Sequence, residues 1–565
     1  MKNFLQRPLR LPRLRPYVPE PDDPPIFWFN SERDEIVREV VRRVVEHRSK
    51  SSGQMEYTLN EVAFHEVERL EKQKDSESRE SLGKWRGLLR RVSRMNDDER
   101  RDALREIALN MAKDVAGNFD PRVYAFAGHA VPRLLTAVMK PASLPLALVS
   151  GAPEALDKML ITEGCIPKLR RLAQIGTLIF VPTHSSNLDS VALGYALMRE
   201  GLPPVSYGAG KNLFTNPIIS FFMHNLGAYR LDRRIKATLY KDVLKTYSTV
   251  MIERGYHSLF FPGGTRSRSN LIETHLKLGL AGTGIEAFAR NQARGVKRPV
   301  FFVPTTINYA LVLEAETLIE DHLKEHGKAR YIIEDDEFSQ IDRWIDFFRR
   351  LTALASACVI RFGEPVDPFG NDIDDDGRSI SPNGQVIDPS TYVMTRGEVK
   401  VDGGRDAAYT KELGETIAKR FLSDTVIMSS QLVAHVLFRA LVKATPGVDL
   451  FGRLRYRGEV SMPIDDLYRE IGEARDALIA LEQQGQVRVS PSLRNETPEY
   501  LVDRSIAFWD GYHTRIVARR SGTDMVAEDP TLLLYYQNRL VPYAQRIAPA
   551  DLHDVATEIV RMERR

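Results

Sequence analysis

Between residues 170 and 365 the chain alternates short apolar runs with amphipathic stretches, and this alternation constrains the fold more than any other feature. The apolar runs are expected to be buried strands, at 177–182, 204–209, 257–262, 299–304 and 357–363. The amphipathic stretches between them predict helices, notably at 189–200, 239–255 and 279–292. Strand–helix alternation indicates an α/β fold with a largely parallel sheet, in which ligands bind where strands end and helices begin.

The regions on either side of this α/β stretch differ in composition. Residues 31–150 carry helical apolar spacing, as in "DEIVREVVRRVVEH", and we expect Asn96 or Asp97 to cap a helix. The predicted organisation follows from these changes: a basic proline-rich arm at 1–30, an N-terminal helical region at 31–150, an α/β domain at 151–365, a polar loop at 366–404 and a mainly helical C-terminal region at 405–565.

The polar loop contains "DIDDDG", which matches the opening of a calcium-binding loop. The twelfth position is Asn383, where such a loop needs a glutamate, and no flanking helices are expected. The sequence therefore favours a solvated turn at this place.

Composition excludes several classes of function. The formal net charge of the 565-residue chain is only +3, too small to imply nucleic-acid binding, although local basic patches remain possible. Cys165 and Cys358 are its only cysteines, too few for a disulfide framework or a thiolate metal cluster. A reducing, cytoplasmic setting is therefore expected.

Membrane contact has to be judged from three segments. The basic proline-rich arm lacks the apolar core of a signal peptide. It is either disordered or a basic segment that binds anionic lipid. No stretch of ~18 uninterrupted apolar residues occurs, so no spanning helix is predicted. Residues 129–151 include Arg133 and Lys140 and could lie on a membrane surface, and "NPIISFFMHNLG" is either an interfacial patch or core.

The first motif with chemical potential is "VPTHSSNLDS", which follows the strand at 177–182. His184 and Asp189 lie five positions apart at a strand-to-helix turn. A carboxylate that holds one ring nitrogen makes a histidine a general base, whereas an aspartate at this place can also cap the helix. The spacing alone leaves both interpretations open. Ser185 and Ser186 are weak nucleophile candidates because the chain has no G-x-S-x-G elbow.

Two glycine-containing turns concentrate arginine. In "LGAYRLDRR" Gly227 precedes a short strand and Arg233, and "FFPGGTRSRS" carries Arg266 and Arg268. The guanidinium fork matches phosphate oxygens, so convergent arginines predict a phosphate pocket, although any one of them alone could lie on a solvated rim. No G-x-x-x-x-G-K-[ST] sequence is present, which argues against a nucleoside triphosphate.

Taken in order, these elements resemble the four sequence blocks of the glycerolipid acyltransferases, and within them the glycerol-3-phosphate and dihydroxyacetone-phosphate acyltransferases of the PlsB type. The matching blocks are H-SSNL-D (184–189), G-AYRLD-R (227–233), F-PG-GTRSR (261–268) and V-PTT-I (303–307). The resemblance is strong from about 170 to 360. It is looser in the C-terminal third, where "EDPTLLLYYQNRLV" resembles the longer glycerol-phosphate enzymes.

The resemblance implies a role for each matching residue. His184 would deprotonate the acceptor hydroxyl, and Asp189 would orient its imidazole. The remaining residues would bind the phosphate-bearing substrate or shape the turn around it: Arg233, Gly264, Thr265, Arg266, Ser267, Arg268 and Lys277.

The resemblance also implies the reaction. A fatty acyl group would pass from acyl-CoA or acyl carrier protein to the sn-1 hydroxyl of glycerol 3-phosphate, giving lysophosphatidate, with no metal and no cofactor besides the acyl donor. The enzyme would act as a peripheral protein on the cytoplasmic side of the cell membrane. The alternatives are 1-acylglycerol-3-phosphate or dihydroxyacetone phosphate as acceptor, and a non-catalytic lipid-binding member of the family.

Three positions depart from the family pattern. Gly263 stands where the third block usually has a glutamate, Arg230 replaces the phenylalanine of the second block, and Ser185 replaces an arginine common beside the histidine. The loss of the glutamate removes a charged contact. We therefore expect the specificity for the acceptor to differ at Gly263.

Overall fold

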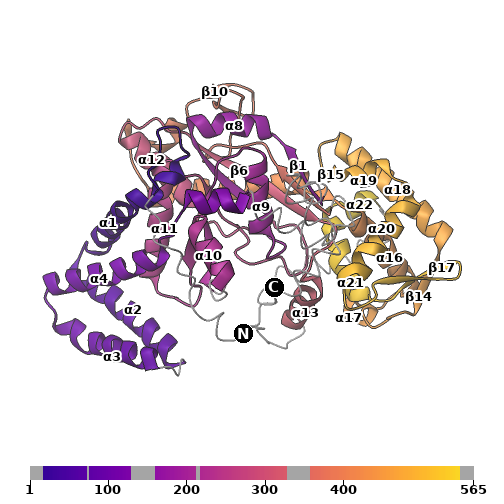
Figure 1. Cartoon of the computed structure of the whole chain (residues 1–565), viewed down its shortest axis with the longest axis horizontal. Helices are drawn as coiled ribbons and strands as arrows, with labels where there is room; N and C mark the ends of the chain where they lie inside the picture. Colours follow the sequence, from indigo (N-terminus) through magenta and orange to yellow (C-terminus); the bar gives the residue numbers. More distant parts are fainter. Residues whose placement is uncertain (1–16, 73–75, 129–158, 212–216, 327–356, 548–565) are drawn as a thin grey trace.

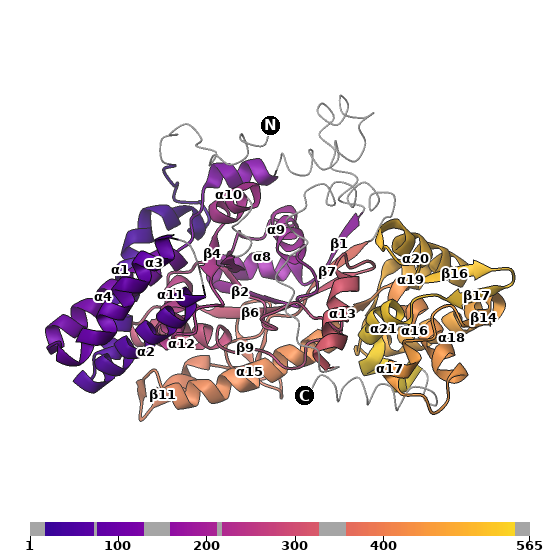
Figure 2. The same ribbon diagram turned by 90° about the horizontal axis from the view of Figure 1, so that it is seen from below.

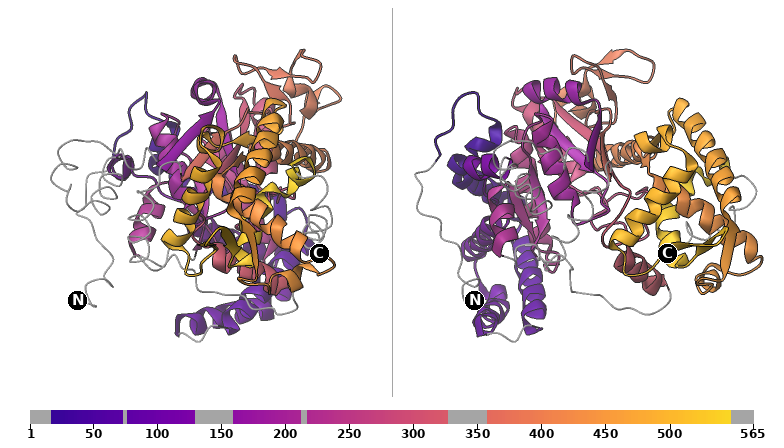
Figure 3. Two further views of the ribbon diagram at one scale, coloured as in Figure 1. Left: turned by 90° about the vertical axis from the view of Figure 1, so that its right-hand side faces the viewer. Right: turned by 45° about the vertical axis from the view of Figure 1, so that its right-hand side comes forward.

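The computed structural model describes residues 17–72, 76–128, 159–211, 217–326 and 357–547. A central α/β part lies between an N-terminal helical part and a C-terminal, mainly helical part, which sit at opposite ends of the molecule (Figure 1). The right-hand view of Figure 3 shows the same separation of the indigo and yellow ends.

A seven-stranded sheet forms the centre, in the order β1-β7-β6-β2-β5-β3-β4. Every residue of β2 and β6 is buried, which explains why β2 and the first half of β6 are apolar runs rather than alternating ones. The pairs that join β6, β2, β5, β3 and β4 are all parallel, so the predicted α/β fold is confirmed. The strands are β1 (Leu160–Gly164), β2 (Thr177–Pro182), β3 (Ser206–Gly210), β4 (Ala228–Leu231), β5 (Ser258–Leu259), β6 (Val300–Tyr309) and β7 (Cys358–Phe362).

Three details of the sheet differ from the expectation. β7 pairs antiparallel with β6, and β1, which the apolar runs did not predict, pairs parallel with β7. β5 is only two residues long. β6 continues five residues past Pro304 to Tyr309 because its neighbour β7 pairs with that extension, and it thereby carries Tyr309 toward the predicted site.

Helices cover both faces of the sheet, with α9 and α15 on opposite sides (Figure 2). α9 begins directly after the loop that follows β2, so its first turn lies at the carboxyl end of that strand. The helices of this part are α8 (Ile166–Ile175), α9 (Asp189–Arg199), α10 (Pro217–Asn225), α11 (Thr238–Glu253), α12 (Ala281–Ala293), α13 (Ala315–His326) and α15 (Gly403–Asp424).

The N-terminal helices pack on α11 through the apolar stripe that their spacing predicted. Ile36 and Val40 are fully buried, and Asn96 caps the fourth helix in a capping box with Glu99, as expected. A buried ion pair crosses the same interface, where Arg43 donates two hydrogen bonds of 2.6 and 2.9 Å to Glu253. The helices are α1 (Phe29–Arg48), α2 (Ser52–Glu71), α3 (Ser76–Arg91) and α4 (Asp97–Val115).

The predicted polar loop contains short hairpins rather than irregular chain. Asp374 accepts hydrogen bonds from the backbone N–H groups of Asp376 and Arg378 at the turn between β8 (Asp372–Ile373) and β9 (Ser379–Ile380). This aspartate therefore closes a hairpin turn. The further short elements here are β10 (Val386–Ile387), β11 (Met394–Thr395) and β12 (Glu398–Val399).

The C-terminal part is mainly helical but also contains a three-stranded antiparallel sheet, β14-β17-β16, which the sequence did not predict. Its helices are α16 (Ser429–Ala444), α17 (Leu450–Arg453), α18 (Ile464–Gln483), α19 (Pro491–Asn495), α20 (Pro498–Tyr512), α21 (Pro530–Gln537) and α22 (Ala544–Ile547), with a 3₁₀ helix, η7 (Asn538–Tyr543), before α22. Its strands are β13 (Val426–Ile427), β14 (Val460–Pro463), β15 (Arg488–Val489), β16 (Ala518–Ser521) and β17 (Asp524–Ala527).

No helix within the described residues is both long enough and apolar enough to cross a bilayer. In α10, Met223 is buried and accepts a hydrogen bond from the hydroxyl of Tyr207, while Phe221 and Phe222 are half-buried. Part of the predicted interfacial patch thus packs against the protein. Residues 1–16 of the basic arm and the segment 129–151 lie outside the described residues.

Candidate active site

His184 and Asp189 form a close pair at the carboxyl end of β2. The Nδ1 atom of His184 lies 2.8 Å from Oδ2 of Asp189, whose side chain is fully buried. The imidazole keeps 16% of its surface exposed, so a ligand has access to the ring. The capping alternative is not realised, because Leu188 holds the capping position of α9 and Asp189 is its first residue.

Asp189 is surrounded by hydrogen-bond donors. Its Oδ2 also accepts from the backbone N–H groups of Ser185 (2.7 Å) and Ser186 (3.0 Å), and its Oδ1 accepts from the hydroxyl of Tyr309 (2.7 Å). Burial, followed by the charge of Asp189, raises the pKa of Tyr309 well above its ordinary value, so the phenol remains a donor. An aspartate with this many donors acts as an acceptor, which assigns the proton of His184 to Nδ1 and leaves a lone pair on Nε2.

The loop of the third block holds His184 from the other side. The ring of Phe261 stacks on the imidazole at a centroid distance of 4.1 Å and an interplanar angle of 25°. The backbone N–H of Ser267 donates to the carbonyl of His184 at 2.7 Å, and Glu273 accepts from the His184 N–H at 3.0 Å. The histidine is thus fixed through its ring and through both of its backbone polar groups.

A tight turn at Gly264 shapes the predicted phosphate loop. Gly264 has a φ of +72°, in the left-handed region that favours glycine. Lys277 lies over this turn, because a Cβ atom at position 264 would come within 2.9 Å of its Nζ. The Lys277 N–H also donates to the carbonyl of Pro262 at 2.7 Å, which closes the loop at its base. The exposed Thr265 lies at the tip.

Two of the three predicted phosphate arginines lie near each other. Much of the Arg233 side chain is exposed. Partial burial of its guanidinium and the positive charge of Arg266 lower the pKa of this group. Within the described part of the chain, Arg233 forms no ion pair, whereas Arg266 donates to Glu314 at 3.2 Å. Like charges held together in this way favour binding of an anion.

Arg268 lies at the edge of the site. It forms an exposed ion pair with Glu325 of α13 at 2.7 Å, with 42% of its own side chain accessible. This exposed position favours the interpretation of Arg268 as a residue of the solvated rim over a direct contact between Arg268 and the phosphate.

Four residues of this neighbourhood were missed by the sequence reasoning. Glu314 accepts from the Ser186 hydroxyl, the Asn187 N–H and Arg266, and so connects the first block to the third. Tyr309 and Glu273 contact the His–Asp pair as described above. Arg539 is 2% exposed and comes from η7 of the C-terminal part. Tyr309 and Glu314 lie in "INYALVLEAETL" (307–318), which continues the fourth block, and Arg539 lies in "EDPTLLLYYQNRLV". These two stretches were the sequence signals available.

The C-terminal part also supports the phosphate loop directly. The side-chain amide of Asn270 donates to the carbonyl of Tyr535 at 3.1 Å, and that of Asn538 donates to the carbonyl of Ser269 at 2.9 Å. Asn270 has a φ of +64°, which asparagine tolerates better than most residues. The end of the loop is therefore locked to α21 and η7.

The two serines beside His184 do not form a nucleophile site. The Ser186 hydroxyl donates to Glu314, and the Ser185 hydroxyl is buried without a hydrogen-bond partner among the described residues. This geometry supports His184, rather than a serine, as the reactive group.

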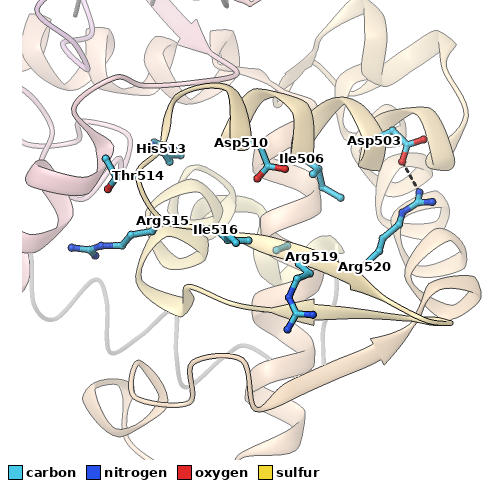
Figure 4. Close-up of a pocket in the computed structure, with 10 residues that line it drawn as sticks. Asp503, Ile506, Asp510, His513, Thr514, Arg515, Ile516, Arg519 and Arg520 are labelled. Carbon is cyan, nitrogen blue, oxygen red and sulfur yellow. Dashed lines mark hydrogen bonds and ion pairs between the residues drawn. The ribbon is translucent and has the colours of Figure 1, made fainter.

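A separate cavity of about 640 Å³ lies in the C-terminal part, around α20 and β16 (Figure 4). Its arginines are matched with acids: Arg520 with Asp503, Arg519 with Glu528, and Arg515 with Glu320 and Asp529. It contains none of the residues that the sequence predicted for a site.

Residues 166–307, which carry the four blocks, match the family model described as Acyltransferase. This part of the chain is therefore a domain of the glycerolipid acyltransferase superfamily, as the motifs predicted. Similar curated proteins carry the name glycerol-3-phosphate acyltransferase. One from Pseudomonas paraeruginosa is 33% identical over 155 residues, which is 27% of this chain and 18% of the relative.

Two other relatives with that name extend the matched stretch. The protein from Aeromonas hydrophila is 32% identical over 201 residues (35% of this chain, 23% of the relative), and one from Pseudomonas fluorescens is 30% identical over 205 residues (36% and 22%). The matched part thus covers about a fifth of the length of these curated relatives.

Proposed function

We propose that this chain transfers a fatty acyl group from an acyl thioester, either acyl-CoA or acyl carrier protein, to the sn-1 hydroxyl of glycerol 3-phosphate. The observation that carries the proposal is the hydrogen bond between the Ser267 N–H and the His184 carbonyl, at 2.7 Å. It joins the arginine loop to the base, so an acceptor whose phosphate binds the loop has its hydroxyl near the imidazole.

In the proposed reaction, Nε2 of His184 removes the proton of the sn-1 hydroxyl while Asp189 stabilises the resulting imidazolium through Nδ1–H. The alcohol oxygen attacks the thioester carbonyl carbon and forms a tetrahedral intermediate. That intermediate collapses with cleavage of the carbon–sulfur bond, and the thiolate takes the proton from Nε2. The products are lysophosphatidate and the free thiol, and His184 returns to its starting state.

Arg233 and Arg266 would bind the phosphate of the acceptor, with Lys277 and the turn at Gly264 and Thr265 completing the pocket. Arg266 is already oriented by Glu314, which leaves little side-chain freedom to lose on binding. Ser267 would contribute through its backbone, and Arg268 through its charge at the rim. Holding the acceptor in this way converts a bimolecular encounter into a positioned reaction, a large source of acceleration.

The proposed location is a membrane surface, since the acyl products are amphipathic. The half-buried Phe221 and Phe222 of α10 and the basic arm are the segments expected to contact lipid. Glycerol 3-phosphate, the acyl donor and this surface are the proposed partners, and the cytoplasmic side of the cell membrane is the proposed side.

The function is tested by measuring thiol release from palmitoyl-CoA and palmitoyl-acyl carrier protein with glycerol 3-phosphate, lysophosphatidate or dihydroxyacetone phosphate as acceptor. We expect release with glycerol 3-phosphate that His184→Ala abolishes. Arg266→Ala should raise the KM for the acceptor about tenfold, because a charge-assisted fork is lost, and the matched change Arg268→Ala should raise it less than threefold. Release that needs lysophosphatidate and ignores glycerol 3-phosphate would reassign the acceptor. Undiminished activity of His184→Ala would reject the base.

A further inference from the structure

The space beside Gly263 is filled by another residue of the chain. A Cβ atom at position 263 would lie 2.9 Å from both Cδ and Oε1 of Glu273 and 3.0 Å from its Oε2, closer than such atoms approach. A side chain at position 263 would therefore displace the carboxylate of Glu273. The space directly beside Cα of residue 263 is thus taken by a carboxylate, supplied from ten residues further along.

The path of the chain explains how Glu273 reaches this place. The hydrogen bond from the Lys277 N–H to the carbonyl of Pro262 brings the two ends of the segment 263–276 together. Asn270, in the middle of this segment, is hydrogen-bonded to Tyr535 and turns the chain back in a left-handed conformation. Glu273 consequently points into the loop that it belongs to rather than out to solvent.

The carboxylate of Glu273 acts on the backbone of His184. Its Oε1 accepts the His184 N–H at 3.0 Å, while its Oε2 is shielded from solvent. Phe261 and Asp189 hold the ring of His184, and Glu273 holds the backbone N–H, while the Ser267 N–H holds the backbone carbonyl. A shielded carboxylate with this contact does not face the acceptor.

A buried cation balances this carboxylate. Burial lowers the pKa of the Arg539 guanidinium, and the negative charge of Glu273 opposes that effect more than any other group around it. Arg539 belongs to η7, the 3₁₀ helix next to Asn538, which is hydrogen-bonded to the same loop. The C-terminal part thus supplies a compensating charge for Glu273.

We infer that Glu273 is a positioning residue of this acyltransferase, which takes over from residue 263 the carboxylate of the third block and uses it to hold the backbone of the base His184. The inference rests on the proposed function. It predicts that loss of Glu273 lowers kcat without weakening acceptor binding. It also predicts that a carboxylate at position 263 can replace the carboxylate at position 273.

The exchange is tested with Glu273→Gln, Glu273→Ala, Gly263→Glu and the double variant Gly263→Glu/Glu273→Ala. Glu273→Gln keeps an oxygen that can accept the His184 N–H, so its kcat should fall less than fivefold. Glu273→Ala should lower kcat tenfold to a hundredfold with a KM for glycerol 3-phosphate within twofold of the wild type, since displacement of a catalytic group costs about this much.

The single variant Gly263→Glu should be at least as impaired as Glu273→Ala, because two carboxylates then compete for one space. The double variant should recover kcat above both single variants, a coupling expected only of groups that share a site. Melting temperatures measured on all four proteins show whether each variant is folded. The matched control is Glu325→Ala. Glu325 is the exposed ion-pair partner of Arg268, and the loss of its carboxylate should leave kcat unchanged within twofold.

A second measurement is independent of turnover. The rate at which diethyl pyrocarbonate modifies His184, read from peptide masses, should differ from wild type in Glu273→Ala and return toward it in the double variant. A double variant no better than Glu273→Ala in both readouts would overturn the inference, as would a rise in KM without a fall in kcat. If the wild type itself transfers no acyl group to glycerol 3-phosphate, the proposed function fails, and the modification rates alone decide whether Glu273 holds His184.

Discussion

Besides His184, three residues donate hydrogen bonds to Asp189. Ser185 and Ser186 donate their backbone N–H groups to Oδ2, whereas Tyr309 donates its side-chain hydroxyl to Oδ1. Removing the phenol leaves the two backbone donors on Oδ2 and frees the carboxylate to rotate. Tyr309→Phe should therefore lower kcat about tenfold to a hundredfold, the effect of one hydrogen bond to a charged group, without changing the KM for the acceptor. Steady-state kinetics on the purified variant measures this effect.

Tyr256→Phe is the matched control for that prediction. Tyr256 is also buried and also donates to a carboxylate, Glu32, at 2.8 Å, but it lies in the N-terminal interface. Its loss should lower the melting temperature by a similar amount and leave kcat unchanged. Equal kinetic effects of the two changes would mean that Tyr309 acts only through stability.

The sequence predicted the site residues that stand in recognisable motifs, including Arg233 and Arg266, and missed the partners that reach these motifs from far along the chain. His184 and Asp189 share one loop, so their spacing alone suggested a pair. Glu273, Tyr309 and Glu314 reach their partners across 89, 120 and 128 positions. Contacts of this length depend on how strands are ordered in the sheet, and no local periodicity encodes that order.

At the scale of elements, α1, α11 and the end of α12 meet at one buried carboxylate. Glu253 has a side chain that is 2% exposed and binds Arg43 at 2.6 Å and Arg294 at 2.7 Å. Burial lowers the pKa of Arg43, whereas its hydrogen bonds to Glu253 and, to a smaller extent, to Glu39 raise it. The net change is an increase, so this guanidinium is charged. Glu253→Gln leaves that buried charge poorly compensated and should lower the free energy of unfolding by about 3 kcal/mol.

Thermal and urea unfolding measure this loss, and Glu46→Gln provides the comparison. Glu46 pairs with Arg42 on the outer face of α1, where both side chains are more than half exposed, so its removal should cost less than about 0.5 kcal/mol. Similar costs for the two substitutions would show that burial does not strengthen the role of Glu253.

Full apolar runs located strands, although the run at 257–262 forms only the two-residue β5, and β1, which lacks such a run, was missed. β2 has the predicted limits, because all six of its residues are buried between helices. β1 contains Thr162 and Glu163 and ends at an exposed glycine, so its sequence lacks the apolar signal. The antiparallel direction of β7 could not be predicted either, since the same apolar residues fit a strand that runs in either direction.

At the scale of the whole molecule, buried histidines connect stability to pH. Burial lowers the pKa of His257 and of His435 to about 4, with the charges of Arg298 and Arg439 acting in the same direction. Both are neutral in the folded protein, whereas in the unfolded chain they take up protons below about pH 6.5. The unfolded state then binds more protons, so stability should fall as the pH is lowered from 6.5 toward 4.

Melting temperatures between pH 7.5 and 5 measure this dependence. His435→Leu removes one of the two groups from the core of α16 and should flatten the decline, while the exposed change His275→Leu should not. An unchanged slope in His435→Leu would contradict the assignment of that histidine.

The two asparagine hydrogen bonds that lock the end of the phosphate loop join residues 265 and 269 positions apart. During synthesis the loop therefore exists long before its partners do. At about 5 to 20 residues per second, the ribosome needs roughly 13 to 50 s to make the intervening chain. Throughout that interval the arginine loop has no support from α21 and η7. The anion pocket can therefore be completed only after α21 and η7 have been synthesised.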